Sequence, residues 1–185
     1  NVWEIFFLIH TGRGRQEAEL TPDQCESVCQ FLYHAAQYGI TVRTVEAPFF
    51  RRVASELSGE ATSEPRLTDL AKLLIEDLYK LNGKLTHPPQ ARSANTRDGR
   101  GIVFVAHNGE VTPSGFLPVS VGNARELTIT YHYREAPLML QLRESKGLGG
   151  RCGRCSYMEI CGGSRARAYA AFGDVMAEDP SCAFL

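Results

Sequence analysis

The first part of the chain carries a strand–helix–strand pattern of apolar residues. Residues 2–9 (VWEIFFLI) form an almost continuous apolar run, which is typical of a parallel strand covered on both faces. A helix is predicted to begin at Thr21 and Pro22, with Gln24 completing a capping box. A second strand is predicted over residues 40–47. Two strands joined by a helix indicate an α/β fold with parallel pairing.

The helix after Thr21 has an apolar stripe at helical spacing. The residues predicted to be buried on it are Val28, Phe31, Leu32, Ala35 and Ala36. Further helices are predicted over residues 49–57 and 67–81, the second closed by Asn82-Gly83. Residues 82–101 are rich in Pro, Gly, Arg and Asn, which predicts a mobile loop.

The pattern changes after Gly101. Residues 102–116 (IVFVAHNGEVTPSGF) are predicted to form a β-hairpin with a type I′ turn at Asn108-Gly109. Residues 135–143 are predicted to form a short helix. The second part of the chain is therefore expected to be α+β.

The composition is that of an ordinary globular chain. Of 185 residues, 43% are hydrophobic, and the formal net charge of −1 does not indicate a nucleic-acid or acidic-membrane partner. No apolar run is long enough to span a bilayer, and the first residues lack the basic leader of a signal peptide. The six cysteines are badly distributed for a disulfide framework, so we expect a reducing, cytoplasmic setting.

Four cysteines gather near the end of the chain with the spacing C-x2-C-x5-C-x20-C. They are Cys152, Cys155, Cys161 and Cys182. A C-x2-C pair brings two thiolates to one metal site from a single turn, and Gly162 and Gly163 allow the backbone to approach the sulfurs closely. The spacing is compatible with structural zinc and with an iron–sulfur cluster, and it leaves both open.

The segment from Cys152 to Cys182 resembles the SPASM extension, which carries auxiliary clusters in radical S-adenosylmethionine enzymes. The family pattern runs C-x9–15-G-x4-C, then C-x2-C-x5-C-x3-C, then a final C, and these four cysteines match the ligands of the outer [4Fe–4S] cluster. Ser114 stands where G-x4-C expects a cysteine, Arg165 ends C-x3-C, and no cysteine lies in the 15 residues before Gly109. The resemblance therefore implies one auxiliary cluster, without the inner one.

Two arginines, Arg165 and Arg167, follow the third cysteine of this motif. Cations at these positions would offset the net negative charge of a four-thiolate cluster. A solvated helix face is the alternative explanation.

The N-terminal part is similar to the same superfamily. Residues 6–14 (FFLIHTGRG) and 42–54 (VRTVEAPFFRRVA) resemble the fifth and sixth strands of its partial barrel. The implied fold is α/β: the C-terminal part of a partial (β/α)6 TIM-like barrel over residues 1–62, a helix and flexible linker loop over 63–101, and a small α+β SPASM-type iron–sulfur domain with a β-hairpin over 102–185.

Active sites of such barrels lie at the C-terminal ends of the strands. The resemblance therefore implies that Gly12, Arg13, Gly14 and Glu46 lie on the S-adenosylmethionine or substrate side. The alternatives are a plain connecting loop for the glycine-containing stretch and a loop carboxylate bound to a neighbouring arginine for Glu46.

Radical S-adenosylmethionine chemistry needs a C-x3-C-x2-C motif, which this chain lacks. Cys25 and Cys29 imitate the first half of the motif, but they fall in the predicted helix, where we expect two small buried residues. The chain opens without a methionine on its most apolar segment, so we expect a fragment, inactive alone, whose second [4Fe–4S] cluster belongs to an upstream part.

For the full-length protein, the resemblance implies an enzyme that converts S-adenosylmethionine to a 5′-deoxyadenosyl radical, which abstracts hydrogen from a peptide, tetrapyrrole or other small substrate. The auxiliary cluster would transfer electrons or support the structure, with a flavodoxin or ferredoxin as reductant. The alternative is a zinc- or cluster-stabilised binding module without catalysis. Neither interpretation indicates a nucleic-acid partner, a membrane partner or an oligomeric state.

Overall fold

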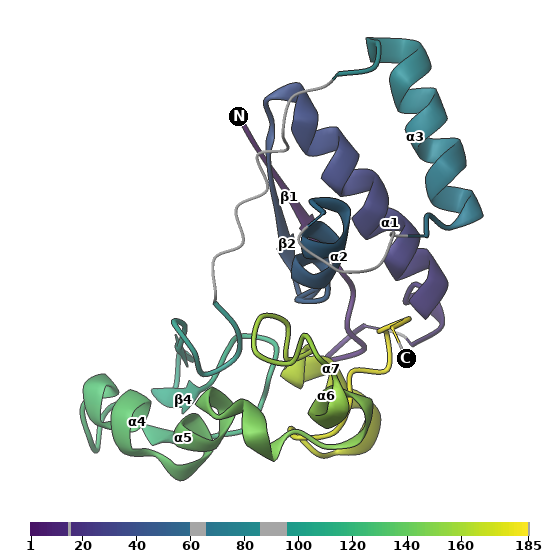
Figure 1. Ribbon diagram of the computed structural model, residues 1–185. Helices are drawn as coiled ribbons and strands as arrows, with labels where there is room; N and C mark the ends of the chain where they lie inside the picture. The colour runs from purple at the N-terminus through teal and green to yellow at the C-terminus, as the bar shows by residue number, and fades with distance from the viewer. Residues whose placement is uncertain (15, 60–65, 86–95, 185) are drawn as a thin grey trace. The chain divides into compact units, whose positions relative to one another are not determined.

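The computed structural model describes residues 1–14, 16–59, 66–85 and 96–184 (Figure 1). The chain divides into two compact units. Unit 1 comprises Asn1–Leu8, Ala18–Ser93 and Ser181–Leu185, and unit 2 comprises Ile9–Glu17 and Ala94–Pro180. The domain boundaries expected from the sequence stay a prediction, and half of the expected loop, residues 86–95, lies outside the described residues.

The sheet of unit 1 is a parallel pair. β1 (Val2–Phe6) pairs with β2 (Thr41–Val45), with Val2 opposite Thr41 and Phe6 opposite Val45. The ladder continues one residue past β1, because the Phe7 amide donates to the Val45 carbonyl at 3.0 Å. The predicted strand–helix–strand order and the α/β class are confirmed.

Helix α1 (Pro22–Ala35) connects these strands, and its start follows the predicted capping box. The Gln24 amide donates to the Thr21 hydroxyl at 3.3 Å, and the Thr21 amide donates to the Gln24 side chain at 2.9 Å. A short 3-10 turn (Ala36–Tyr38) follows, and Gly39 ends it in the left-handed region at φ 73°. Both ends of this helix are therefore set by local sequence.

The prediction that the first strand is covered on both faces is wrong. Val2 is 59% exposed and Phe6 is 62% exposed. Within the described residues this sheet has only the two strands β1 and β2. Burial begins just after the strand at Phe7, whose ring meets Phe49 edge-on with the centroids 5.6 Å apart. An apolar run marks a strand that can be buried, but the number of neighbouring strands decides whether it is.

Two helices pack against α1: α2 (Phe50–Leu57) and α3 (Asp69–Asn82), which runs beside it in Figure 1. Leu32, Ala35 and Ala36 of the predicted stripe are buried, whereas Val28 and Phe31 are partly exposed. Buried residues outside the predicted stripe are Cys25, Ser27, Cys29, Gln30 and Tyr33. Neighbours on more than one side of α1 widen its buried surface beyond one stripe. The expected burial of Cys25 and Cys29 is confirmed at 2% and 0% exposure.

Two buried polar residues of α1 hold the start of α3. The Ser27 hydroxyl lies 2.7 Å from the hydroxyl of Thr68, the N-cap of α3. The Gln30 side chain accepts from the Thr68 amide at 2.9 Å and donates to the Arg66 carbonyl at 3.2 Å. These bonds satisfy polar groups that would otherwise be costly to bury.

A buried arginine joins α1 and α2. Arg52 is 3% exposed and forms ion pairs with Glu26 and, at 2.8 Å, with Glu56. Its guanidinium also lies over the Phe184 ring, 4.9 Å from the centroid. The C-terminal tail of unit 1 thus contacts the same cation that links the two helices.

Unit 2 contains the predicted hairpin within a three-stranded antiparallel sheet. Its strands are β3 (Phe104–Val105), β4 (Glu110–Thr112) and β5 (Gly122–Asn123). The predicted type I′ turn is wrong, because Gly109 has φ 87° whereas Asn108 is not at positive φ. The Gly109 amide donates to the Ala106 carbonyl at 2.9 Å, as in a three-residue loop that ends in a left-handed glycine.

The remainder of unit 2 is helical. Its helices are α4 (Ile129–Glu135), α5 (Pro137–Arg143), α6 (Gly150–Arg154) and α7 (Arg165–Phe172), with a 3-10 turn at Ser145–Gly147. The helix predicted over 135–143 corresponds to α5. It begins at Pro137 because Ala136, which precedes the proline, is extended at ψ 131°. The apolar core of the unit is built from Ile9, Leu117, Leu142, Ala166 and Met176.

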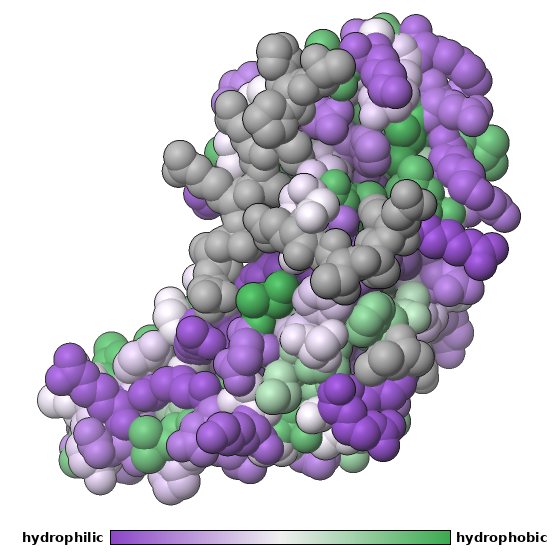
Figure 2. Space-filling view, in the orientation of Figure 1, coloured by the Kyte–Doolittle hydropathy of each residue, from purple (hydrophilic) through white to green (hydrophobic). Residues whose placement is uncertain are grey.

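The visible surface mixes hydrophilic and hydrophobic side chains, and over α3 the hydrophilic ones dominate (Figure 2). Leu73 and Leu81 of that helix are 60% and 84% exposed. Among the described residues, no helix has the length and apolar character needed to cross a bilayer.

Replacing Arg52 with alanine is expected to lower the free energy of unfolding of unit 1 by about 3 kcal/mol, because two largely buried carboxylates lose their counter-charge. Lys72→Ala is the control, since Lys72 and Asp69 form an exposed pair that is screened by water and contributes little to stability. Urea unfolding followed by circular dichroism measures both. Equal losses of stability would contradict the role given to Arg52.

Candidate metal centre

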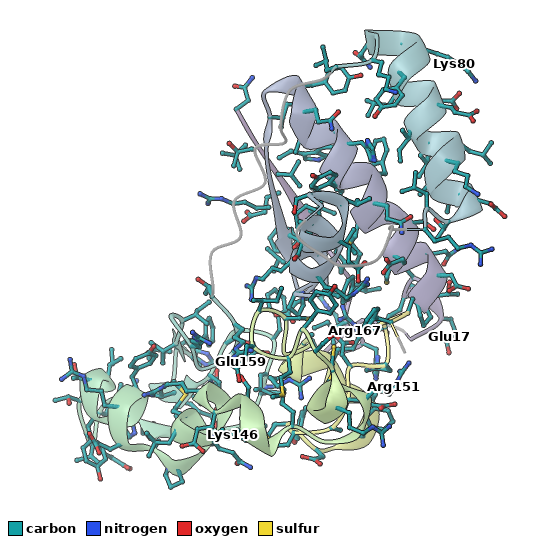
Figure 3. All side chains as sticks on the ribbon, in the orientation of Figure 1. Glu17, Lys80, Lys146, Arg151, Glu159 and Arg167 are labelled. Atoms are coloured by element: carbon teal, nitrogen blue, oxygen red, sulfur yellow. The ribbon has the colours of Figure 1, made fainter. Side chains whose placement is uncertain are left out.

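The C-x2-C pair lies on one short helix. Cys152 belongs to α6, and Cys155 is its C-cap. The segment around Glu178 holds the start of this helix: the Arg151 amide donates to the Glu178 carboxylate at 2.7 Å, and the Arg151 side chain pairs with it at 3.2 Å (Arg151 is labelled in Figure 3). The first two thiols of the motif therefore come from one turn, as the spacing predicts.

Nitrogen donors face the sulfurs of both cysteines. The Asp179 amide donates to Cys152 Sγ at 3.4 Å, and the Tyr157 amide donates to Cys155 Sγ at 3.4 Å. The Arg165 side chain approaches Cys152 Sγ from its Nη2 atom at 3.9 Å. Such N–H···S bonds stabilise thiolates that ligate a metal.

The third cysteine precedes the two glycines. Cys161 is 8% exposed, and its amide donates to the Tyr157 carbonyl at 2.9 Å. Gly163 lies in the left-handed region at φ 64°, and a Cβ there would stand 3.1 Å from Cys152 Sγ and 2.8 Å from Asp179 Cβ. Only glycine lets the backbone pass so close to the sulfur.

A buried ion pair fixes the residue whose amide faces Cys152. Arg167 and Asp179 are 1% and 0% exposed, and they pair at 3.4 Å. Asp179 also accepts the Ser164 amide at 2.7 Å. The alternative of a solvated helix face for Arg165 and Arg167 is wrong, because both side chains are buried.

The fourth cysteine falls in the other unit. Cys182 belongs to unit 1, where its Sγ lies 4.0 Å from the Phe184 carbonyl oxygen. None of the six cysteines, all of which lie in the described residues, forms a disulfide. Within the described ranges, no three His, Cys, Asp or Glu side chains converge on a single metal-ion position. The set of four ligands therefore stays a prediction.

The donor chemistry of unit 2 fits a thiolate-bound metal group. Three thiols lie along one short segment, two of them accept N–H bonds, and a glycine makes room beside one sulfur. Zinc and an iron–sulfur cluster both take such donors. The chemistry of these donors therefore fits the group that the resemblance implies, and the arrangement of the four sulfurs around that group stays a prediction.

Ser114 and Arg165, the two positions that the SPASM resemblance assigns to ligands of the inner cluster, bind a carboxylate. Asp98, Ser114 and Arg165 are 5%, 3% and 2% exposed. Asp98 accepts hydrogen bonds from the Ser114 side chain and from the amides of Arg165 and Ala166, the latter at 3.0 Å. Burial raises the pKa of the Asp98 carboxyl, while these hydrogen bonds and the Arg165 charge oppose the rise. A buried polar network thus occupies these positions.

Sequence reasoning missed Asp98, because it lies in the stretch interpreted as a mobile loop. The described end of that stretch forms a turn in which the Arg97 and Arg100 backbones bond to each other at 2.8 and 3.0 Å. An Asp-Gly pair between two arginines was the available signal for this turn.

The residues predicted on the S-adenosylmethionine side show two turn features. Gly12 has φ 58°, and the Gly14 amide donates to the Thr11 carbonyl at 2.9 Å, so the stretch that includes Arg13 forms a tight turn in unit 2. Glu46, in unit 1, has φ 60° and is the only non-glycine residue at positive φ in the described part of the chain. Such outliers are enriched at functional sites, and the role of these four residues stays a prediction.

No protein-family model matches the chain. It is 33% identical over 183 residues to an AdoMet-dependent heme synthase of Methanosarcina barkeri, which covers 98% of this chain and 48% of that protein. It is 28% identical over 185 residues to an AdoMet-dependent heme synthase of Nitratidesulfovibrio vulgaris, covering 98% and 46%. It is 30% identical over 119 residues to a pre-heme d1 synthase of Dinoroseobacter shibae, covering 57% and 30%. Homologues with these names thus cover this chain, and the chain spans about half the length of the heme synthases that it matches.

Replacing Gly163 with alanine is expected to destabilise unit 2 by more than the roughly 1–2 kcal/mol that a left-handed alanine costs, because its Cβ would also press on Cys152 and Asp179. Gly173→Ala is the matched control, with φ 68° and no atom within 4 Å of the added Cβ. Thermal unfolding in reducing buffer compares the two variants. An equal loss of stability in both variants would show that Gly163 is needed only for its positive φ, and not for the space beside Cys152.

Proposed function

We propose that this chain is the C-terminal half of a radical S-adenosylmethionine enzyme that acts on a tetrapyrrole. In this proposal Cys152, Cys155, Cys161 and Cys182 hold one auxiliary [4Fe–4S] cluster. The observation that carries the proposal is the match of nearly the whole chain to AdoMet-dependent heme synthases. The N–H donors directed at Cys152 and Cys155 support it independently.

The relatives narrow the substrate class that the sequence left open. Their names refer to heme and to pre-heme d1, which are tetrapyrroles, and none refers to a peptide. We therefore favour a porphyrin-type substrate over the peptide and the unrelated small molecule. In this proposal the radical-generating cluster and S-adenosylmethionine are held by a part of the full-length protein outside this chain, because the chain has no C-x3-C-x2-C motif.

The exposed apolar strand supports a place for unit 1 in a larger sheet. Val2, Trp3 and Phe6 are 59%, 42% and 62% exposed on β1. An exposed apolar edge strand is a pairing surface that proteins normally cover. In the whole enzyme we propose that a further strand of the partial barrel pairs there.

At the proposed metal centre, the role of this chain is to hold thiolates in a positively polarised loop. The amides of Tyr157 and Asp179 polarise two sulfurs, and Gly163 lets the backbone close over Cys152. When bound, the cluster would supply one-electron transfer, with a flavodoxin or ferredoxin as the reductant. Four cysteine ligands leave no iron open to substrate, so electron transfer or structural support is the function proposed for this centre.

Anaerobic treatment of the chain with iron and sulfide is expected to give a brown protein with about four irons and four sulfides. Alanine at Cys152, Cys155, Cys161 or Cys182 should remove the colour and loosen the C-terminal region, since ligation is coupled to folding. Absorbance and iron analysis measure the outcome.

Cys25→Ala and Cys29→Ala are the controls, because these two cysteines are buried in α1 of unit 1. They should leave the iron content unchanged. A colourless chain that binds one zinc under the same conditions would favour the zinc-stabilised binding module instead.

The full-length protein is expected to form 5′-deoxyadenosine from S-adenosylmethionine when it is given dithionite and a porphyrin substrate. This chain alone is expected to form none, because it has no C-x3-C-x2-C motif. Chromatography of the nucleoside products distinguishes the two cases. Turnover by the isolated chain would show that the radical-generating site has been misplaced.

A further inference from the structure

The guanidinium of Arg165 is held in place by backbone carbonyls. Its Nε donates to the Gly163 oxygen at 3.3 Å, and its Nη1 donates to the oxygens of Val175 and Ala177 at 3.0 and 2.6 Å. The residue is 2% exposed. Three acceptors from two backbone segments therefore fix both the position and the orientation of this cation.

No carboxylate in the described part of the chain forms an ion pair with this guanidinium, although its charge reaches the Asp98 carboxylate. Among the described residues, no Asp or Glu side chain lies within ion-pair distance of Arg165. The Asp179 carboxylate is paired with Arg167, and the Asp98 carboxylate accepts the main-chain amide of Arg165. Carbonyl oxygens satisfy N–H groups without cancelling a charge, and a buried cation is costly without an anion near it.

The remaining nitrogen of this side chain faces a sulfur. Nη2 of Arg165 lies 3.9 Å from Cys152 Sγ, which also accepts the Asp179 amide. A thiolate at Cys152, and the net negative charge of a cluster bound to it, would supply a negative charge in direct contact with the guanidinium. At this contact the buried guanidinium charge of Arg165 would act on the Cys152 sulfur.

We propose that Arg165 is a positioning residue for the auxiliary cluster, where its buried charge and its N–H directed at Cys152 raise the reduction potential. This inference rests on the proposed function. In the family pattern this position would carry a ligand of the inner cluster, so the residue that replaced that ligand would serve the outer one.

The direction of the effect follows from charge. Reduction of the cluster adds one electron, supplied by dithionite in the experiment, and no bond to the protein forms or breaks. A fixed cation stabilises the more negative, reduced state more than the oxidised state. Removing the cation must therefore favour the oxidised state.

Arg165→Gln and Arg165→Lys in the reconstituted chain test the inference, with Arg154→Gln as the matched control. Arg154 lies between Cys152 and Cys155 in the sequence and carries the same charge as Arg165. Its side chain is exposed, so water screens this charge. Potentiometric titration, followed by electron paramagnetic resonance of the reduced cluster, measures the midpoint potential. Iron content and thermal unfolding show whether each variant is folded and loaded.

At the wild-type midpoint potential, Arg165→Gln is expected to raise the oxidised-to-reduced ratio of the cluster about tenfold. This change corresponds to a midpoint potential lower by about 59 mV for a one-electron couple. The midpoint potential of Arg165→Lys should stay closer to that of the wild type. The midpoint potential of Arg154→Gln should shift less than that of Arg165→Gln. An unchanged potential in Arg165→Gln, or an equal shift in Arg154→Gln, would overturn the inference.

If Arg165→Gln takes up no iron, Arg165→Lys decides between a role for the charge and a structural role. An Arg165→Lys variant that binds the cluster with a near-wild-type midpoint potential supports a role for the charge. Loss of the cluster in Arg165→Lys as well would show that the arginine is purely structural and would overturn the inference. Failure of the wild-type chain to take up iron would contradict the proposed function itself, which is a different result from an unchanged potential.

Discussion

Thiolate sulfurs that share one small loop repel one another, lose water, and need positive partners that the protein must supply. In unit 2 these partners come from backbone amides and from one cation, at Tyr157, Asp179 and Arg165. Much of the surrounding structure keeps them in place. The buried Arg167–Asp179 pair fixes the amide that faces Cys152, and the Glu178 carboxylate holds the start of the helix that carries it. The proposed metal centre and the fold of this unit therefore depend on the same contacts.

Unit 1 uses a buried cation for a different purpose. Arg52 joins α1 and α2 through Glu26 and Glu56, and its guanidinium also contacts Phe184 in the tail that carries Cys182. The fourth proposed ligand thus belongs to a segment that is anchored within unit 1. A ligand on such an anchor costs less entropy to immobilise than one on a free chain end. The inclusion of Cys182 in the ligand set stays a prediction.

Sequence reasoning succeeded where local chemistry decides the outcome, as in the capping box at Thr21 and the burial of Cys25 and Cys29. It failed where the number and direction of neighbours decide. The exposure of β1 depends on strands beside it, and the burial of Arg165 depends on carbonyls at Val175 and Ala177. The cysteine spacing predicted the C-x2-C turn, but no periodic pattern indicates the amide donors, because backbone groups leave no signature in sequence.

One auxiliary [4Fe–4S] cluster per chain is tested most directly by Mössbauer spectroscopy of the chain reconstituted with isotopically enriched iron. The proposal predicts that nearly all of the iron gives the signal of an oxidised [4Fe–4S] cluster, with about four irons per chain. The same signal should disappear when Cys161 is replaced by alanine. Iron that shows only mononuclear or adventitious signals, in a chain that still folds, would contradict the account.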